Sequence, residues 1–306
     1  MTRSRRLVLG PATVALLAVL PLVVRRDDVL NFLFLVLLSI TLAQSWNIVA
    51  GYAGQVNLGH AAFFGLGALT TRTLWSAGTP VLAGMAAGAV VAALFALVIG
   101  AAAFRLRGAY FAIGTLALGE ILRITVGNVL AEVSTLPATT IAGYRLANRY
   151  YLALGLAAVA VLAVAALGSS RLGLGMQAIR EDEDAAEASG VGALRLKLLA
   201  LSLSTALAGL AGGLFAYYHI SYYPAHPFSP TWTFDSLLIT FIGGVGTVHG
   251  PLLGAVFYVF LKEFLAIRWV DFHLLIFGAL FVAIVLLLPG GLVEAVARLR
   301  AFTRRA

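Results

Sequence analysis

The stretch GLGMQAIREDEDAAEASGVGALRLKLLALSLSTALAGLAGGLFAYY, residues 173–218, decides the fold. Its first part carries five acidic residues between positions 181 and 187, and its second part is an apolar run from 195 to 218. An apolar segment of about 20 residues has the length of a helix that crosses a lipid bilayer. The stretch therefore predicts a charged surface segment that leads directly into a membrane-spanning helix.

The rest of the chain shares this apolar character. Hydrophobic residues make up 61% of it and charged residues 11%, and the mean hydropathy is +0.98, whereas soluble domains carry about 25% charged residues. We therefore expect an all-α, multi-pass membrane protein surrounded by the lipid bilayer. About ten spans are expected: 7–24, 29–49, 58–76, 80–104, 108–131, 150–168, 195–218, 233–248, 250–267 and 272–289. Eight or nine spans are the alternatives, because the eighth is short and the Gly-rich third could be re-entrant.

Lys and Arg predict the orientation, because they accumulate on the cytoplasmic side of a membrane. With a retained first helix and ten spans, both termini are cytoplasmic, and residues 169–194 form a cytoplasmic loop within one domain, 1–306. The net charge of +8 then reflects residues that flank spans, and no nucleic-acid partner is expected. The cytoplasmic side holds Arg3, Arg5, Arg6, Arg105, Arg107, Arg171, Arg180, Arg195, Lys197, Arg298, Arg300, Arg304 and Arg305, against Arg25, Arg26, Arg72, Arg145, Arg149 and Arg268 outside.

The charged loop has the composition of a helix. Residues 176–189 lack Gly and Pro and are rich in good helix formers, so they predict one helix of about four turns that ends at Gly190. Met176, Ile179 and Ala186 fall near one face of it. Its net charge is negative, and anionic lipid would repel it. Two interpretations remain open on charge alone: a docking element for another protein, and a solvated helix without a partner.

Two glycine-rich segments interrupt the apolar spans: GYAGQVNLGHAAFFGLGA at 51–68 and FIGGVGTVHGPLLGAVF at 241–257. Clustered glycines permit a helix break in which backbone groups line a path, and they equally permit close packing of helices. Both interpretations stay open. The candidate path residues are Gln55, Asn57, His60, Gly243, Gly244 and His249.

Other chemistry is sparse. Glu120 and Arg123 are three residues apart within one span, and they predict either a structural ion pair or a gate. The chain has no Cys and no phosphate-binding GxxxxGK[ST] motif. We expect no catalytic residues, no metal site and no cofactor. The neutral candidate path suits a small neutral or zwitterionic solute.

Three motifs resemble those of one transporter family. The run GMQAIREDEDAAEASGV with LRLKLLALSLSTALAGLAGGLFAYY, together with the two glycine-rich segments in the same order, resembles the branched-chain amino-acid ABC permeases of the LivM type. The resemblance implies a type II-like importer permease of the bacterial inner membrane. It also implies that the charged loop couples the permease to a cytoplasmic ATPase, through Arg180, Glu181, Asp182, Glu183, Ala185, Ala186 and Gly190.

The implied function is to form a path for leucine, isoleucine or valine, energised in trans. The implied partners are two ATPase subunits, a homologous second permease and a soluble substrate-binding protein. One alternative keeps the scaffold and imports urea, short amides or a simple sugar. An alternative of another class is an ion-coupled secondary transporter, for which Glu120 is the candidate membrane acid.

Overall fold

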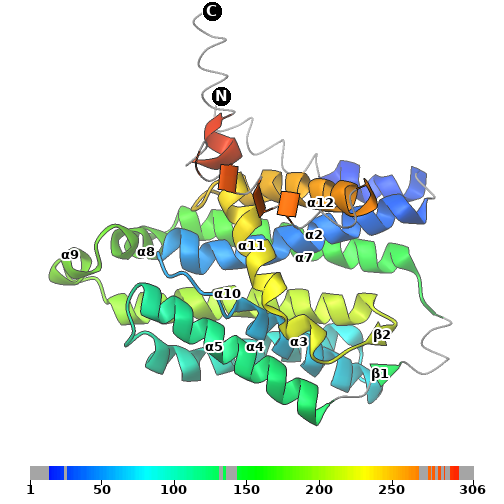
Figure 1. Ribbon diagram of the computed structural model, residues 1–306, viewed down its shortest axis with the longest axis horizontal. Coiled ribbons are helices and arrows are strands. Elements are labelled where there is room, and N and C mark those ends of the chain that lie inside the picture. The colour runs from blue at the N-terminus through cyan, green and yellow to red at the C-terminus, as the bar shows by residue number, and fades with distance from the viewer. Residues whose placement is uncertain are drawn as a thin grey trace, which may run out of the picture.

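The computed structural model describes residues 14–23, 26–130, 134–135, 143–268, 275–276, 278–279, 282–283, 286 and 290–295. The described part is almost entirely helical (Figure 1), which confirms the all-α prediction. Its elements are a helix at Val14–Val23, then α2 (Asp27–Asn47), η1 (Ile48–Tyr52, a π-helix), α3 (His60–Ser76), α4 (Val81–Ala103), α5 (Ala109–Val129), β1 (Ser134–Thr135), α7 (Leu146–Gly168), α8 (Arg171–Glu181), α9 (Glu183–Ala188), α10 (Ala193–Tyr218), β2 (Ser221–Tyr222), η2 (His226–Phe228), α11 (Pro230–Gly243) and α12 (Gly250–Arg268).

Eight of the ten predicted spans coincide with helices, from α2 to α12. Within the described residues, five helical segments are long and apolar enough to cross a membrane: Asp27–Tyr52, α4, α5, α7 and α10. Helix α3 has 17 residues and α11 has 14, which is shorter than a full crossing of about 20. The span predicted at 7–24 is described only over the short apolar helix Val14–Val23, and the span predicted at 272–289 lies largely outside the described residues, so the total of ten stays a prediction.

The orientation also stays a prediction. Its excess of cytoplasmic Lys and Arg depends on seven terminal residues that lie outside the described part of the chain: Arg3, Arg5, Arg6, Arg298, Arg300, Arg304 and Arg305. Figure 1 nevertheless distinguishes two ends of the helical body, with α8 and α9 at one and the β1–β2 strand pair at the other. We call them the α8–α9 end and the strand end.

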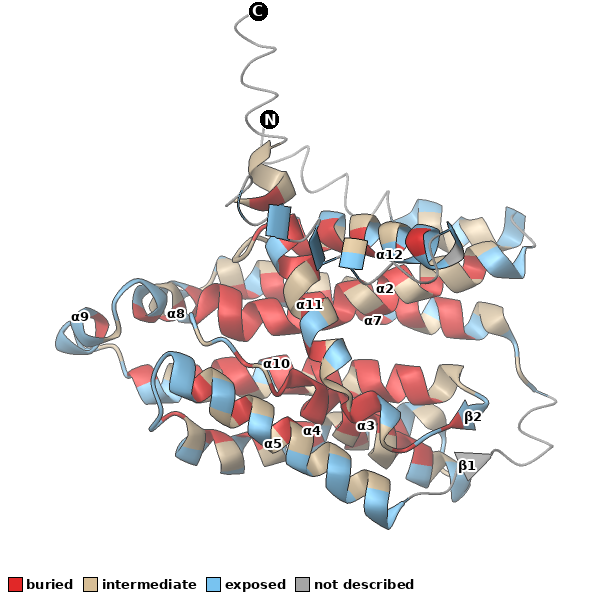
Figure 2. Cartoon of the chain, viewed as in Figure 1, coloured by how far each residue is buried: buried red, intermediate tan, exposed pale blue. Residues whose placement is uncertain are grey.

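Helix α10 lies at the centre of the fold. Of its most apolar stretch 67% is buried, against 22% for α5, and Figure 2 shows the contrast. Small residues allow α3 and α4 to approach it closely: a Cβ at Gly212 would lie 1.9 Å from the Phe64 carbonyl oxygen, and one at Gly67 would lie 2.1 Å from that of Gly209. Such close backbone approach is typical of helix packing in membranes.

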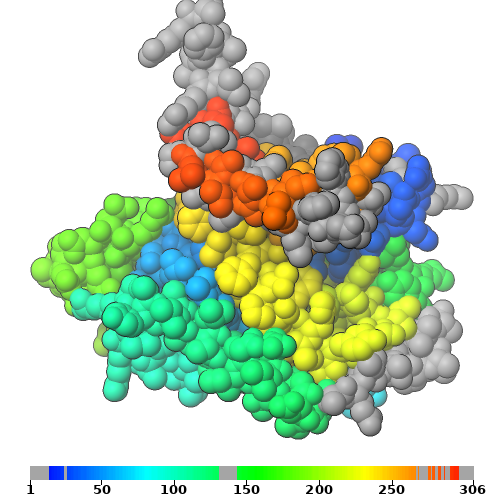
Figure 3. Space-filling view, in the orientation of Figure 1, coloured from blue at the N-terminus to red at the C-terminus, as the bar shows by residue number. Residues whose placement is uncertain are grey.

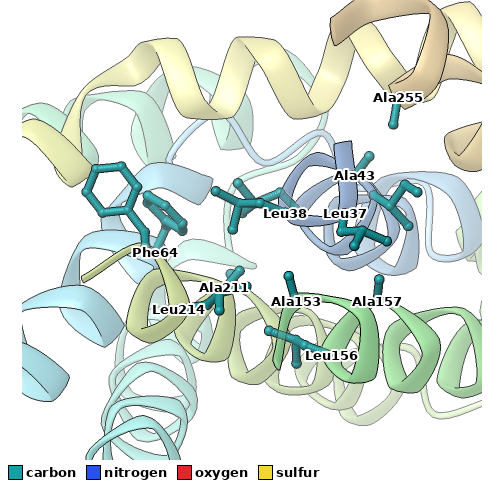
Figure 4. Close-up of a cluster of buried hydrophobic side chains, with 14 of the residues drawn as sticks. Leu37, Leu38, Ala43, Phe64, Ala153, Leu156, Ala157, Ala211, Leu214 and Ala255 are labelled. Carbon is teal, nitrogen blue, oxygen red and sulfur yellow. The ribbon is translucent and has the colours of Figure 1, made fainter. Parts of the chain in front are cut away.

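The largest apolar cluster joins α10 to α2, α3, α7 and α12. In Figure 4 side chains from these helices meet between the ribbons, and the labelled residues are Leu37, Leu38, Ala43, Phe64, Ala153, Leu156, Ala157, Ala211, Leu214 and Ala255. The cluster fixes α2 and α10 relative to each other. Both helices carry residues of the candidate functional site at the α8–α9 end.

Two buried arginines close the strand end. Arg72 of α3 donates to the carbonyl oxygens of His219 at 3.1 Å and Ile220 at 2.8 Å, and Arg149 of α7 donates to that of Tyr217 at 3.0 Å. The last carbonyls of a helix have no partner within it, and a cation there is favourable. These contacts hold the end of α10 against α3 and α7. The strands pair antiparallel beside it, with Ser134 opposite Tyr222.

Candidate functional site

The charged segment consists of two helices rather than one. Helix α8 begins at Arg171 and includes Gly173, and α9 follows it after a break at Asp182, whose backbone is extended (φ −157°, ψ 110°). The predicted single helix over 176–189 is therefore wrong. The reason is local: the Asp182 carboxylate accepts a hydrogen bond from the Ala185 amide at 3.0 Å, so Asp182 starts a new helix as its N-cap.

The end and the buried face of the segment follow the prediction. Gly190 ends it with φ +84°, a conformation that favours glycine. Met176, Ile179 and Ala186 are buried, and the last two pack against Ala193 at the start of α10. Ala186, which the family resemblance places in the contact with the ATPase, therefore faces the permease body instead of the surface.

Glu183 also faces inward. Its carboxylate lies 2.5 Å from the ammonium group of Lys197 on α10, and the two side chains are 23% and 3% exposed. A lysine this deeply buried requires a partner. The pair attaches the start of α9 to α10, and sequence analysis missed it because the two residues are on different helices.

The opposite side of the segment carries its exposed acidic surface. Glu181, Asp182, Asp184 and Glu187 are exposed, as are Ala185 and Gly190. Asp184 makes an exposed pair with Arg107 at 3.2 Å, which contributes little to stability. Figures 2 and 3 show α8 and α9 protruding from the end of the helical body. This segment thus presents acids to its surroundings and fixes Glu183 and Ala186 to the body.

The two glycine-rich segments both contain breaks. In the first, α2 widens into η1 at Ile48–Tyr52, residues 53–59 are non-helical, and α3 starts at His60. In the second, α11 ends at Gly243 and α12 starts at Gly250. The residues between them form a turn, 244–249, with positive φ at Gly244 and Gly246. π-Helices and broken helices in membrane proteins often mark functional sites.

These two breaks contact each other. The Asn47 side chain accepts a hydrogen bond from the Gly246 amide at 2.8 Å and donates one to the Thr247 carbonyl oxygen at 2.9 Å. Gln44 donates to the Val248 carbonyl oxygen at 2.7 Å. Both donors are on α2, so the turn 244–249 is fixed to the end of α2. Neither Asn47 nor Gln44 was singled out from the sequence.

Arg180 joins α8 to this junction. Its guanidinium donates to the Gly51 carbonyl oxygen at 2.5 Å. A cavity of about 370 Å³ lies between α8 and the junction, lined by Gly51, Gln177, Ala178, Arg180, Glu181 and Gly246. The resemblance assigned Arg180 to the contact with the ATPase, whereas its hydrogen bond is to the permease itself.

The six candidate path residues occupy different environments. Asn57 and His60 are buried, Gln55 is half-buried, and His249 is exposed. His60 shares a hydrogen bond with Ser45 at 2.8 Å, and Asn57 accepts one from the Gly59 amide at 2.9 Å. Within the described residues, Nδ1 of His60 and Nδ2 of Asn57 are buried without a hydrogen-bond partner. Gly243 and Gly244 are buried at the end of α11.

Crowding explains one glycine at each of the two breaks. A Cβ at Gly243 would lie 1.9 Å from the Gly250 carbonyl oxygen, and one at Gly51 would lie 2.7 Å from the Gly246 amide nitrogen. A side chain at Gly51 would push the first break away from the second, and one at Gly243 would push the end of α11 away from the start of α12. The two glycine-rich segments therefore pack tightly against their neighbours, as the packing interpretation expects. They also place buried polar atoms at a helix break, as the path interpretation expects.

The ion pair predicted within a span is present. Arg123 donates from Nε to Glu120 Oε2 at 2.9 Å and makes a second contact with Oε1. The two side chains are about two-fifths exposed in this chain. Among the described residues, no group of three or more His, Cys, Asp or Glu could hold a metal ion.

Comparison with known proteins identifies the family. A family model described as "branched-chain amino acid transport system / permease component" matches residues 29–285. The chain belongs to this family. The match covers the charged segment, both glycine-rich breaks and α2 to α12, so it includes the whole candidate site. The protein is therefore a transport subunit, the permease component of an ABC transport system, and it is a multi-pass protein of the bacterial inner membrane.

Curated relatives of this permease agree with the assignment. It is 28% identical over 312 aligned residues to the high-affinity branched-chain amino acid transport system permease protein LivM of Escherichia coli, covering 89% of this chain and 71% of the relative. The LivM protein of Salmonella typhimurium is 27% identical over the same shares. A probable LivM protein of Methanocaldococcus jannaschii is 28% identical over 39% of this chain and 38% of its own. No solved structure matches the permease.

Proposed function

We propose that this permease forms the translocation path of an ATP-driven importer for leucine, isoleucine and valine, with ATP hydrolysed by partner subunits. One observation carries the proposal: the α8–α9 segment exposes Glu181, Asp182, Asp184 and Glu187 on one side, while Glu183 and Arg180 attach it to the permease on the other. A merely solvated helix needs no such attachment to α10 and to the first glycine-rich break.

The proposed topology has ten spans of the type II-like architecture, with both termini and the α8–α9 end in the cytoplasm. The exposed acids, together with Ala185 and Gly190, then dock one of two ATPase subunits. Acidic charge favours a basic protein surface and disfavours anionic lipid. A homologous second permease completes the membrane part, and a soluble binding protein delivers the solute at the strand end.

The proposed path runs along the junction of the two glycine-rich segments. Its unpartnered buried atoms, Nδ1 of His60 and Nδ2 of Asn57, are polar groups that a moving helix break exposes to a solute. They are neutral, which suits a zwitterionic amino acid with an apolar side chain. Urea, short amides and simple sugars are alternatives on the same scaffold, and competition for uptake between them and leucine separates these substrates.

The ion-coupled alternative has less support. Its candidate acid, Glu120, is held by two contacts from Arg123, so the carboxylate already has a counter-ion. A secondary transporter requires an acid that binds and releases the coupling ion in the membrane.

Co-purification and uptake test the proposed function together. The tagged permease is purified in mild detergent from its native membrane, and the complex is reconstituted into vesicles loaded with ATP. We expect two ATPase subunits and a second permease in the complex, and leucine uptake that stops without ATP. Purification of the chain alone, with uptake that an ionophore abolishes, would instead establish the ion-coupled alternative.

A further inference from the structure

We propose that Arg180 is the positioning residue that transmits movement of the α8–α9 segment to both glycine-rich breaks in the membrane. This inference rests on the proposed function, because it requires an ATPase that moves the segment. It assigns Arg180 to the transmission of movement inside the permease and leaves the docking of the ATPase to the exposed acids.

The Arg180 side chain bonds directly to the first break. Arg180 is the penultimate residue of α8, two positions before the break at Asp182. Its guanidinium donates to the carbonyl oxygen of Gly51, a buried residue 129 positions earlier in the chain. Gly51 lies in η1, next to the end of the helical stretch, where carbonyl groups lack partners within the helix. A charged donor makes a stronger hydrogen bond to such an oxygen than a neutral one.

Glycines from both breaks surround the Arg180 side chain. A Cβ on Gly246 would lie 2.6 Å from Nη1 of Arg180, and a Cβ on Gly54 would lie 3.0 Å from its Cα. Both glycines also have positive φ, +76° and +71°. Arg180 therefore fits a space that only glycines leave open, with one wall from each glycine-rich segment.

The first break is in turn joined to the second. Asn47 precedes η1 and binds the turn 244–249 twice, at the Gly246 amide and at the Thr247 carbonyl oxygen. Gly51 and Gly246 are also in direct backbone proximity, since a Cβ on Gly51 would lie 2.7 Å from the Gly246 nitrogen. A displacement of Gly51 by Arg180 must therefore displace the turn at the start of α12.

The Arg180 contact differs from the contacts that only anchor the segment. The segment is already anchored to α10 by the Glu183–Lys197 pair and by the packing of Ile179 and Ala186 against Ala193. Helix α10 is central and two-thirds buried. The Arg180 contact is different because its hydrogen-bond partner, Gly51, is on η1 and not on α10. It connects the segment to the two places where the membrane helices are broken.

The test compares Arg180→Gln with Arg171→Gln in the complete reconstituted complex. Arg171 is an exposed arginine on the same helix, so the control removes the same charge. We expect Arg180→Gln to co-purify the ATPase subunits at the wild-type yield and to hydrolyse ATP. Leucine taken up per ATP should fall about tenfold, the size expected for the loss of one hydrogen bond from a charged donor. Arg180→Lys should recover part of this ratio, and Arg171→Gln should leave it unchanged.

A second variant keeps the proposal testable should Arg180→Gln fail to accumulate. Asn47→Ala removes the next connection along the same route, and we expect it to lower leucine uptake per ATP as well. Because both residues act in series, the double variant should be no worse than the more severe single one. Additive losses would contradict the shared route.

Three further outcomes would overturn the inference. A normal uptake ratio in Arg180→Gln would show that Arg180 transmits nothing. Loss of the ATPase subunits from that variant alone would place Arg180 in the docking contact. If the wild-type chain purifies without ATPase subunits, the proposed function fails, and the role of Arg180 fails with it.

Discussion

The ammonium group of Lys197, near the start of α10, lies 2.5 Å from the carboxylate of Glu183, the first residue of α9. The lysine side chain is 3% exposed, so its charge has lost most of its hydration and depends on this partner. The pair connects the central helix α10 to the segment that carries the acidic surface of the permease.

Removing one partner of this pair should loosen α9. We expect Lys197→Met or Glu183→Gln alone to weaken attachment of α9 by about 3–5 kcal/mol, because a buried charge is left without its partner. Limited proteolysis in detergent should then cut within residues 182–190 faster than in the wild type. The double variant Lys197→Met/Glu183→Gln should be cut more slowly than Glu183→Gln. Equal rates in all variants would mean that the pair does not hold α9.

The exposed acids should control docking without changing the fold. Glu181→Lys with Glu187→Lys reverses two charges that make no described hydrogen bond or ion pair within the permease. We expect the ATPase subunits to be lost from the purified complex, while the amount of inserted permease stays unchanged. Arg195→Glu, an equally exposed residue at the same end, is the control. Retention of the ATPase by the double variant would place docking elsewhere.

Asp182→Arg with Glu183→Arg tests the same surface less selectively. We expect this pair of substitutions to abolish uptake and leave insertion intact, as the coupling role requires. It also removes the N-cap of α9 and the partner of Lys197, so it changes attachment and docking at once. Normal uptake by this variant would contradict the coupling role of the segment in either form.

Packing at Gly212 should be intolerant of even one methyl group. A Cβ there would lie 1.9 Å from the Phe64 backbone oxygen, which cannot move away as a side chain could. Overpacking of this kind costs about 1–3 kcal/mol or more, so Gly212→Ala should lower the melting temperature in detergent by several degrees, roughly 2–4 °C for each kcal/mol. Gly155→Ala in α7 is the control, because a Cβ there meets nothing within 4 Å. It should be neutral or slightly stabilising, since alanine favours helices.

Insertion of the permease into the membrane should depend on both members of the Glu120–Arg123 pair. Glu120→Gln leaves the arginine charge unpaired within a spanning helix, where charges cost about 2.5–3.5 kcal/mol on insertion scales. We expect less inserted protein from Glu120→Gln and recovery with the exchanged pair Glu120→Arg/Arg123→Glu, measured by membrane-fraction immunoblot. Full insertion of Glu120→Gln combined with a selective loss of ionophore-sensitive uptake would support ion coupling instead.

The sequence by itself determined the features that depend on local composition and periodicity. Apolar length predicts helices α2–α5, α7 and α10–α12, because a segment in lipid must satisfy its backbone hydrogen bonds within itself. Helical spacing predicts the buried face of Met176, Ile179 and Ala186, and glycine predicts the end of α9 at Gly190. The run of acids indicates an exposed, charged segment, and the glycine clusters indicate two places where helices break.

Only the tertiary structure decided what those features contact. The break at Asp182 depends on which way one carboxylate turns, a choice that composition leaves open. In the sequence, Arg180 and Glu183 both have the pattern of surface charges. In the structure, their partners are Gly51 and Lys197 on other helices. Asn47 is joined to a turn 200 positions later. Such pairings arise from the packing of whole helices around α10, so the periodicity of a single segment does not predict them.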